Sequence, residues 1–173
     1  MKKIIIAIFI ASIGTSAFSQ ECQYEKNEID KFTKSSIKTT KEMLIAGGSL
    51  KLKGTLYASL SKINDSKYLN LKLIMWQNFV IETNAKLMIL LEDETVIDLT
   101  FIKFGVGQYS NNGGMETWTS NVSLNINEEN YKILNQKNAK EIRIYLKEGY
   151  INLPVPDNKK YWSKFKENLK CIE

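Results

Sequence analysis

The sequence contains no histidine, and this absence excludes several classes of enzyme site. A Ser/His/Asp triad, a Cys/His pair and the zinc sites that include histidine all need an imidazole ring. Any catalysis by this chain would depend on carboxylates, lysines and tyrosines. We therefore expect a protein that is not an enzyme, with no catalytic residue, no metal ligand and no cofactor.

Arginine is almost absent, because Arg143 is the only one among 173 residues. Proteins that bind nucleic acids use arginine for bidentate contacts with phosphates and base edges, and they concentrate cations on one surface. Here the lysines are spread along the chain, and 24 basic residues face 19 acidic ones, which is a mild excess. We expect no nucleic-acid partner.

Cysteine is also scarce, with Cys22 and Cys171 as the only two thiols, near opposite ends of the chain. A cysteine pair persists as a disulfide in an oxidising, extracytoplasmic compartment. A catalytic thiol would need a neighbouring base or cation, and its common histidine partner is missing. The sequence therefore predicts an intramolecular disulfide between Cys22 and Cys171.

The first nineteen residues have the pattern of a secretory signal peptide. Lys2 and Lys3 are followed by an unbroken apolar run at residues 4–11, and residues 17–19 place small side chains at positions −3 and −1. A transmembrane helix is the alternative, but the run is shorter than the roughly 20 apolar residues that a bilayer requires. We predict that residues 20–173 form the mature protein, a single β-rich domain without a transmembrane segment, either periplasmic or secreted.

Alternation of apolar and polar residues predicts an antiparallel β fold. Residues 50–60 alternate clearly, and after turn-forming residues at 64–67 the alternation resumes at 68–76, which predicts a hairpin. Further strands are predicted at residues 37–45, 86–91, 95–104, 118–126, 142–146 and 151–155. The polar and charged residues 20–35 are interpreted as a leader into the fold.

A short helix is predicted after the strand that ends at residue 126. Asn127 is a suitable N-cap, and Glu128 and Glu129 would lie at the positive end of the helix dipole. Tyr131 and Leu134 are expected to face inward.

A second helix is predicted at the C-terminus, beginning at Pro156 and Asp157. It carries an apolar stripe at helical spacing, which we expect to cover a sheet: Tyr161, Trp162, Phe165, Leu169 and Ile172. The predicted fold class is α+β, mostly β. It consists of an antiparallel sheet of about seven to eight strands, as a sandwich or partial barrel, with one short helix and a C-terminal helix.

The densest acidic group consists of Glu92, Asp93, Glu94 and Asp98. Such a group could hold Ca²⁺ or supply a carboxylate pair for glycoside hydrolysis. Consecutive acids between two apolar runs are, however, typical of an exposed hairpin tip, and strand alternation directs neighbours to opposite faces. We favour a turn over a site.

The segment from Gly105 to Thr117 holds four of the nine glycines and is interpreted as a long loop. Long loops that carry aromatic residues can dock a sugar or a peptide. We therefore predict Tyr109, Met115 and Trp118 as partner contacts. The dipeptide Asn112-Gly113 equally suits a tight turn that binds nothing.

Two segments resemble small uncharacterised exported proteins of Bacteroidota-type bacteria. They are residues 90–99, LLEDETVIDL, and residues 140–151, KEIRIYLKEGYI. The shared pattern comprises an acidic hairpin, a turn and helix, a second hairpin and a terminal helix. It implies structure without implying any catalytic or binding residue. Glu94 departs from the pattern, because many such hairpins have glycine there.

Three functions are consistent with the sequence. The first is an exported, non-enzymatic binding or structural module of the cell envelope, whose partner is a protein or glycan that contacts a sheet edge or residues 105–117. The second is a carboxylate-based hydrolase in which Asp98 or Glu116 is catalytic. The third is a cationic binder of lipid surfaces that uses the lysines of the C-terminal helix. The oligomeric state is left open.

Overall fold

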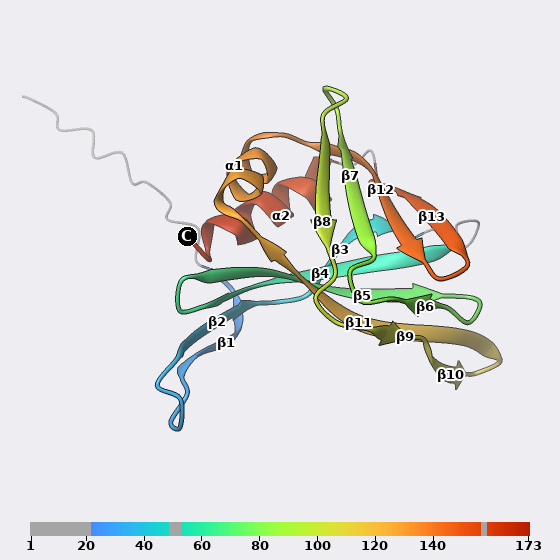
Figure 1. Cartoon of the computed structure of the whole chain (residues 1–173), viewed down its shortest axis with the longest axis horizontal. Helices are drawn as coiled ribbons and strands as arrows, with labels where there is room; N and C mark the ends of the chain where they lie inside the picture. The colour runs from blue at the N-terminus through green and yellow to red at the C-terminus, as the bar shows by residue number, and fades with distance from the viewer. Residues whose placement is uncertain (1–21, 49–52, 157–158) are drawn as a thin grey trace, which may run out of the picture.

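The computed structural model describes residues 22–48, 53–156 and 159–173. The predicted signal peptide at residues 1–19 lies outside these ranges, as do the expected strand residues 50–52 and the expected helix start at Asp157. Figure 1 shows a curled antiparallel sheet with two helices packed together on one side. The structure confirms the α+β, mostly β class and the partial-barrel form. The described residues contain thirteen strands, some only two residues long, where seven to eight were expected.

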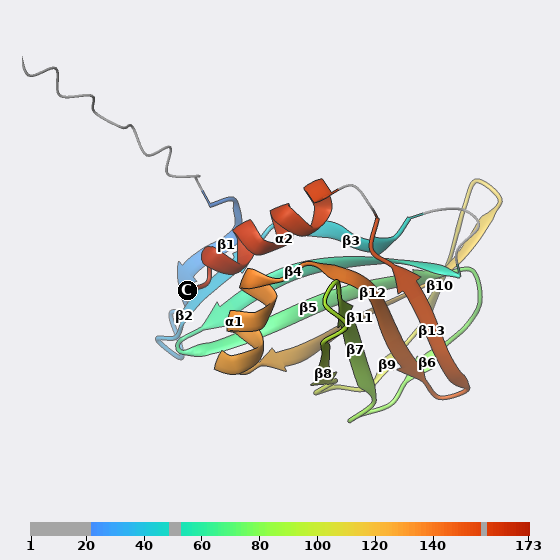
Figure 2. The same cartoon turned by 90° about the horizontal axis from the view of Figure 1, so that it is seen from above.

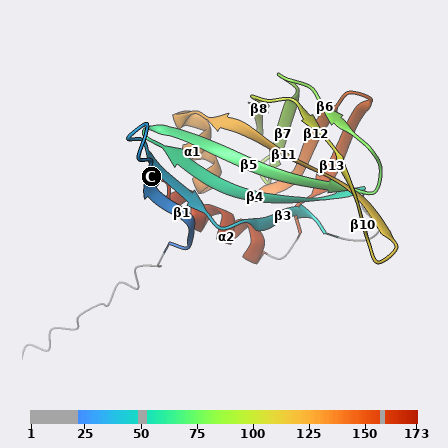
Figure 3. The ribbon, with the colours of Figure 1, turned by 90° about the horizontal axis from the view of Figure 1, so that it is seen from below.

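The larger sheet contains seven strands in the order β1-β2-β4-β5-β11-β10, with β3 also paired to β4. The strands are β1 (Tyr24–Ile29), β2 (Ser36–Thr40), β3 (Met43–Gly47), β4 (Gly54–Ile63), β5 (Ser66–Met75), β10 (Gln108–Asn112) and β11 (Met115–Ile126). Figure 3 shows β4, β5 and β11 side by side along the length of the molecule. Alternate residues of β4, such as Leu56 and Leu60, are buried opposite Leu73 and Leu69 of β5, as period-two alternation predicts.

The smaller sheet has the order β13-β12-β7-β8. Its strands are β7 (Lys86–Leu91), β8 (Val96–Thr100), β12 (Ala139–Leu146) and β13 (Gly149–Pro154), and a separate pair joins β6 (Val80–Ile81) to β9 (Gly105–Val106). Just after β8, Phe101 bridges Leu124 of β11, and the Ile102 amide donates to the Ser123 carbonyl at 3.0 Å. The smaller sheet therefore continues the curl of the larger one into a half-barrel.

Two helices follow the sequence signals that predicted them. In α1 (Glu128–Gln136) the Asn127 side chain accepts a hydrogen bond from the Asn130 amide at 2.7 Å, which is an N-cap contact. In α2 (Lys159–Lys170) the stripe residues Trp162, Phe165 and Leu169 are buried. Helix α2 packs on β3, β4 and α1, as Figure 2 shows from above. The prediction that this stripe covers a sheet is confirmed.

The predicted disulfide between Cys22 and Cys171 is present. Beside it the Tyr24 hydroxyl donates to the Cys171 carbonyl at 2.9 Å, so β1 is fixed to the end of α2 by a covalent bond and a hydrogen bond. Neither helix within the described ranges has the length and apolar character needed to span a bilayer.

Three strand predictions needed correction. Residues 20–35 are more than a leader, because β1 forms at Tyr24–Ile29 by pairing with β2, although its exposed residues lack an alternating pattern. The single strand expected at 37–45 is two strands, since β2 ends at Thr40 and β3 starts at Met43. The strand expected at 95–104 ends at Thr100, apart from the bridge that Phe101 makes to β11.

Candidate functional site

The end of the half-barrel away from the helices is formed by three connections, and we call it the hairpin end. They are residues 76–79 between β5 and β6, residues 147–148 between β12 and β13, and residues 113–114 between β10 and β11. Figures 1 and 2 both place these connections at the opposite end from α1 and the C-terminus. Several exposed aromatic side chains and a cleft lie here.

The expectation that residues 105–117 form a long loop was wrong. These residues form β9, β10 and the start of β11, with Tyr109 paired to Trp118 and Asn112 paired to Met115. Gly113 and Gly114 form the turn with φ of +63° and +89°, a left-handed conformation that favours glycine. The glycines and asparagines that suggested a loop instead make a tight hairpin possible.

Tyr109 and Trp118 form an aromatic pair on one face of this hairpin. Their ring centroids are 5.3 Å apart at an interplanar angle of 61°, an edge-to-face arrangement. Trp118 packs partly against the core, whereas Tyr109 is 56% exposed and its hydroxyl donates to Glu116 at 3.0 Å. Met115 lies three residues from Trp118 along the strand, and therefore on the opposite face. The structure thus brings together two of the three predicted contact residues.

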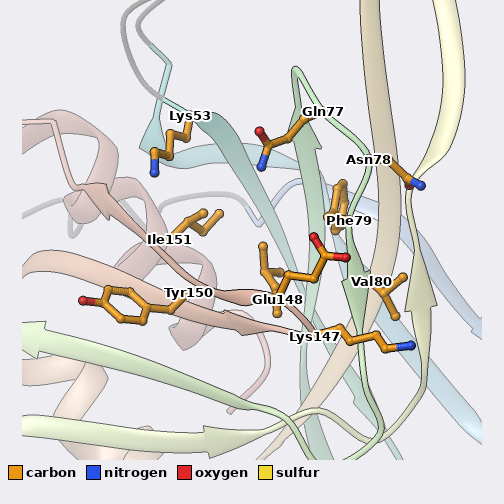
Figure 4. Close-up of a pocket in the computed structure, with 10 residues that line it drawn as sticks. Lys53, Gln77, Asn78, Phe79, Val80, Lys147, Glu148, Tyr150 and Ile151 are labelled. Carbon is orange, nitrogen blue, oxygen red and sulfur yellow. The ribbon is translucent and has the colours of Figure 1, made fainter.

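A cleft of about 280 Å³ opens beside the hairpin. Figure 4 shows Lys53 and Gln77 on one side of it and Lys147 and Glu148 on the other. Apolar side chains of Phe79, Val80, Leu146 and Ile151 also line it, together with Asn78 and Tyr150. Donors, acceptors and apolar surface are thus combined in one concavity, as in sites that orient a ligand with a few polar groups.

The cleft is firmly joined to the aromatic hairpin. The Gly107 amide donates to the Phe79 carbonyl at 3.0 Å, and the Lys147 amide donates to the Val80 carbonyl at 2.9 Å. A Cβ atom at Gly107 would lie 2.9 Å from the Cβ of Trp118 and 3.1 Å from the Phe79 ring. Only glycine lets the chain pass this closely, so β10 and the cleft wall are held as one unit.

The outer rim of the cleft is built around Tyr150, which is 55% exposed. The guanidinium carbon of Arg143 lies 4.4 Å from the centroid of the Tyr150 ring. The centroids of the Tyr145 and Tyr150 rings are 5.9 Å apart. Arg143 is itself oriented by a 2.8 Å hydrogen bond from its Nε to Asn152. The single arginine of the chain therefore positions an exposed tyrosine by a cation–π contact.

Three of the four clustered acids, Glu92, Asp93 and Glu94, form the turn between β7 and β8, where Asp93 and Glu94 are ion-paired and Glu92 accepts a hydrogen bond from Asn138. Asp93 lies 2.6 Å from the Lys137 ammonium group, and Glu94 lies 2.9 Å from that of Lys140. The hydrogen bond from Lys137, with a smaller effect of Thr95, lowers the pKa of Asp93 from 3.8 to about 2. Within the described ranges, no group of three or more acidic or sulfur ligands is placed to hold a metal ion.

Glu94 has a φ of +63°, in the left-handed region that favours glycine. A glycine would adopt this conformation more readily than a glutamate. Glu94 tolerates the position while its carboxylate binds Lys140.

The two acids considered for hydrolysis have different surroundings. Asp98 of β8 lies 2.6 Å from the Lys86 ammonium group, and their contact raises the pKa of Lys86. Glu116 lies on the β10–β11 hairpin and accepts from Tyr109. Each carboxylate is engaged by a neighbour on its own hairpin, which is an arrangement typical of surface structure.

The residues that line the cleft could not be predicted from the sequence, because they come from three segments that lie far apart in the chain. The one local signal was the break in alternation at residues 76–79, where two amide side chains follow Trp76. No family model matches the chain, and no curated protein or solved structure is significantly similar to it.

Proposed function

We propose that this protein is an exported, non-enzymatic binding module of the cell envelope, and that its partner, a protein or a glycan, binds at the hairpin end. The observation that carries the proposal is the cleft of about 280 Å³, which is lined by the exposed Tyr150 and joined through Gly107 to the hairpin that presents the exposed Tyr109 ring. Tyrosine gives a large contact area at a small cost in side-chain entropy, and its hydroxyl group adds a hydrogen bond.

Exposed apolar side chains near this hairpin also support partner binding at the hairpin end. Phe104 and Val106 have exposed side chains next to the strands of this hairpin. Contiguous exposed apolar groups on a folded protein commonly mark interaction surfaces. The ammonium groups of Lys53 and Lys147, the Gln77 amide and the Glu148 carboxylate would supply hydrogen bonds to hydroxyl, amide or acidic groups of the partner.

The proposed location and the non-enzymatic role rest on other observations. A disulfide that joins residues 149 positions apart suits an oxidising compartment, and the first nineteen residues have the signal-peptide pattern. The absence of histidine removes the commonest general base. The carboxylates that sequence reasoning considered for catalysis contact lysines or a tyrosine.

The test is capture from an extract of the native cell envelope, with bound material identified by mass spectrometry for proteins and by sugar analysis for glycans. Tyr109→Ala should abolish capture and leave the thermal midpoint of unfolding nearly unchanged, because the side chain is mostly exposed. Val96→Ala is the control, since this apolar residue is also exposed but lies in β8, outside the hairpin end.

Capture that survives in the double variant Tyr109→Ala/Tyr150→Ala would contradict the proposal. Loss of folding in Tyr109→Ala would show that this residue belongs to the core. Equal loss of capture in Val96→Ala would place the contact elsewhere.

A further inference from the structure

The turn between β1 and β2 presents an aromatic ring to solvent at the end of the molecule opposite the hairpin end. Phe32 is 96% exposed, and Ile29 beside it is 68% exposed. Figure 1 shows the β1–β2 hairpin extending away from the rest of the sheet. The apolar surface of Phe32 contributes almost nothing to the core, so the fold itself does not explain why a phenylalanine stands there.

The turn holds Phe32 in this position. A carboxylate oxygen of Asp30 accepts hydrogen bonds from the Phe32 amide at 3.0 Å, the Thr33 amide at 2.6 Å and the Thr33 hydroxyl at 2.9 Å. These bonds, chiefly that from the Thr33 amide, lower the pKa of Asp30. The backbone of Asp30 also bonds to Lys34 and Ser35 at 2.9 Å each. An Asx-type turn with so many contacts is ordered before any partner arrives.

The base of the turn is fixed to the body of the sheet. The Ser36 amide donates to the Asn64 side chain at 3.1 Å, and the Asn64 amide donates to the Ser36 carbonyl at 2.9 Å. Ile63, next to Asn64 at the end of β4, is a further exposed apolar side chain at this end. The hairpin is therefore a supported projection with an apolar tip.

The charges around the ring indicate what the tip contacts. Lys31 and Lys34 lie on either side of Phe32 in sequence and are exposed, whereas the Asp30 carboxylate is directed into the turn. Farther down β1, Lys26 is paired with Glu28 at 2.9 Å. An aromatic ring between two cations matches the boundary between acyl chains and phosphate headgroups of a lipid bilayer.

We propose that the β1–β2 turn is a contact site for anionic lipid surfaces, with Phe32 inserted at the headgroup boundary and Lys31 and Lys34 bound to lipid phosphates. A protein partner fits less well, because one ring and two isoleucines offer far less area than a stable protein interface buries. The proposal is independent of the function proposed for the hairpin end. If both proposals hold, lipid contact at the β1–β2 turn would leave the hairpin end directed away from the membrane and accessible to its partner.

The test is cosedimentation of the mature protein with vesicles. Binding is expected with vesicles that contain phosphatidylglycerol and phosphatidylcholine, and little is expected with phosphatidylcholine alone. Phe32→Ser should weaken binding at least about tenfold, since a buried phenylalanine side chain is lost from the lipid. Lys31→Gln and Lys34→Gln should each weaken it by about fivefold, and salt should weaken it in the parent protein.

Tyr109→Ser is the matched control, because it removes an exposed aromatic residue from the other end and should leave vesicle binding unchanged. Phe32→Trp should retain binding and add a blue shift of tryptophan emission when vesicles are present. Thermal midpoints of all variants should equal that of the parent, since the exchanged side chains are exposed.

Equal binding by Phe32→Ser and the parent protein would overturn the proposal, as would equal binding to both kinds of vesicle. Absence of vesicle binding together with a Phe32-dependent protein partner would replace it with a protein contact. Because the envelope-capture experiment depends on Tyr109 and this one on Phe32, each proposal can fail without the other.

Discussion

The helical layer, formed by α1 and α2 with the strands they cover, and the hairpin end of the half-barrel differ in how completely the fold buries their aromatic residues. In the helical layer Trp162 and Phe165 are buried with ring centroids 4.5 Å apart, and the Trp162 indole donates to the Lys137 carbonyl at 2.9 Å. The Tyr131 hydroxyl likewise donates to Leu169 at 3.1 Å. At the hairpin end Tyr109 and Tyr150 are more than half exposed. Aromatic residues thus serve stability beneath and within the helices and remain accessible at the hairpin end.

This difference predicts that substitutions beneath the helices change stability, whereas substitutions of exposed residues at the hairpin end change binding. In the helical layer, the apolar surface of α2 is covered and the Cys22–Cys171 disulfide closes the structure beside it. At the hairpin end, strand pairing fixes the backbone while side chains stay exposed. A rigid backbone with accessible aromatic residues is a low-entropy way to present a binding surface.

The largest effect is expected from Phe165→Ala in α2. The side chain is fully buried, so its removal leaves a cavity and should lower the free energy of unfolding by about 3–5 kcal/mol. The adjacent exposed residue provides the control, since Lys164→Ala should change stability by no more than about 0.5 kcal/mol. Chemical denaturation measures both. An equally small effect at Phe165 would mean that α2 is not a structural cover, and the comparison between the two regions would fail.

A smaller loss is expected from Gly107→Ala at the hairpin end. The added methyl group would approach Trp118 and Phe79 closely, and such overpacking costs about 1–3 kcal/mol. It should also reduce envelope capture, because it separates the aromatic hairpin from the cleft wall. Gln108→Ala, at an exposed neighbouring position, is the control that should change neither property. If Gly107→Ala retained the stability and the capture of the parent protein, the aromatic hairpin and the cleft wall would not be held as one unit.

The smallest effect concerns the acidic turn between β7 and β8. The pKa of Asp93 is lowered to about 2, so its ion pair with Lys137 stabilises the fold fully above the unfolded pKa near 3.8. This contribution declines as the pH falls from about 4 toward 2. Carboxyl-carbon NMR should give the low midpoint for Asp93, and Lys137→Gln should raise it toward 3.8. Lys147→Gln, at the hairpin end, should leave it unchanged; an ordinary midpoint in the parent would contradict the pairing.

Elements with a regular pattern could be predicted from the sequence. The alternation in β4, β5 and β11 has one buried face, and the stripe in α2 repeats at helical spacing, so each local pattern reflects one packing surface. Strand β1 could not be found this way, because five of its six residues are exposed and it is held by backbone pairing with β2. The glycines and asparagines of residues 105–114 likewise suggested a loop, because β10 is extended only through its pairing with β11.

The candidate site was only partly predictable for a related reason. Tyr109 and Trp118 were predicted as partner contacts from local aromatic clustering, and the structure pairs them across the hairpin. Met115 was grouped with them by sequence proximity, but strand alternation directs it to the other face. Lys53, Gln77 and Glu148 meet only because distant segments converge in the fold, and no local pattern carries that information.

Hydrogen–deuterium exchange with the captured envelope partner tests the central claim most directly, because it reports where on the protein the partner binds. The account predicts slower exchange at residues 76–80, 105–118 and 147–151, with α1 and α2 unchanged. Protection confined to the helices, or unchanged exchange across all three segments of the hairpin end in a saturated complex, would contradict it.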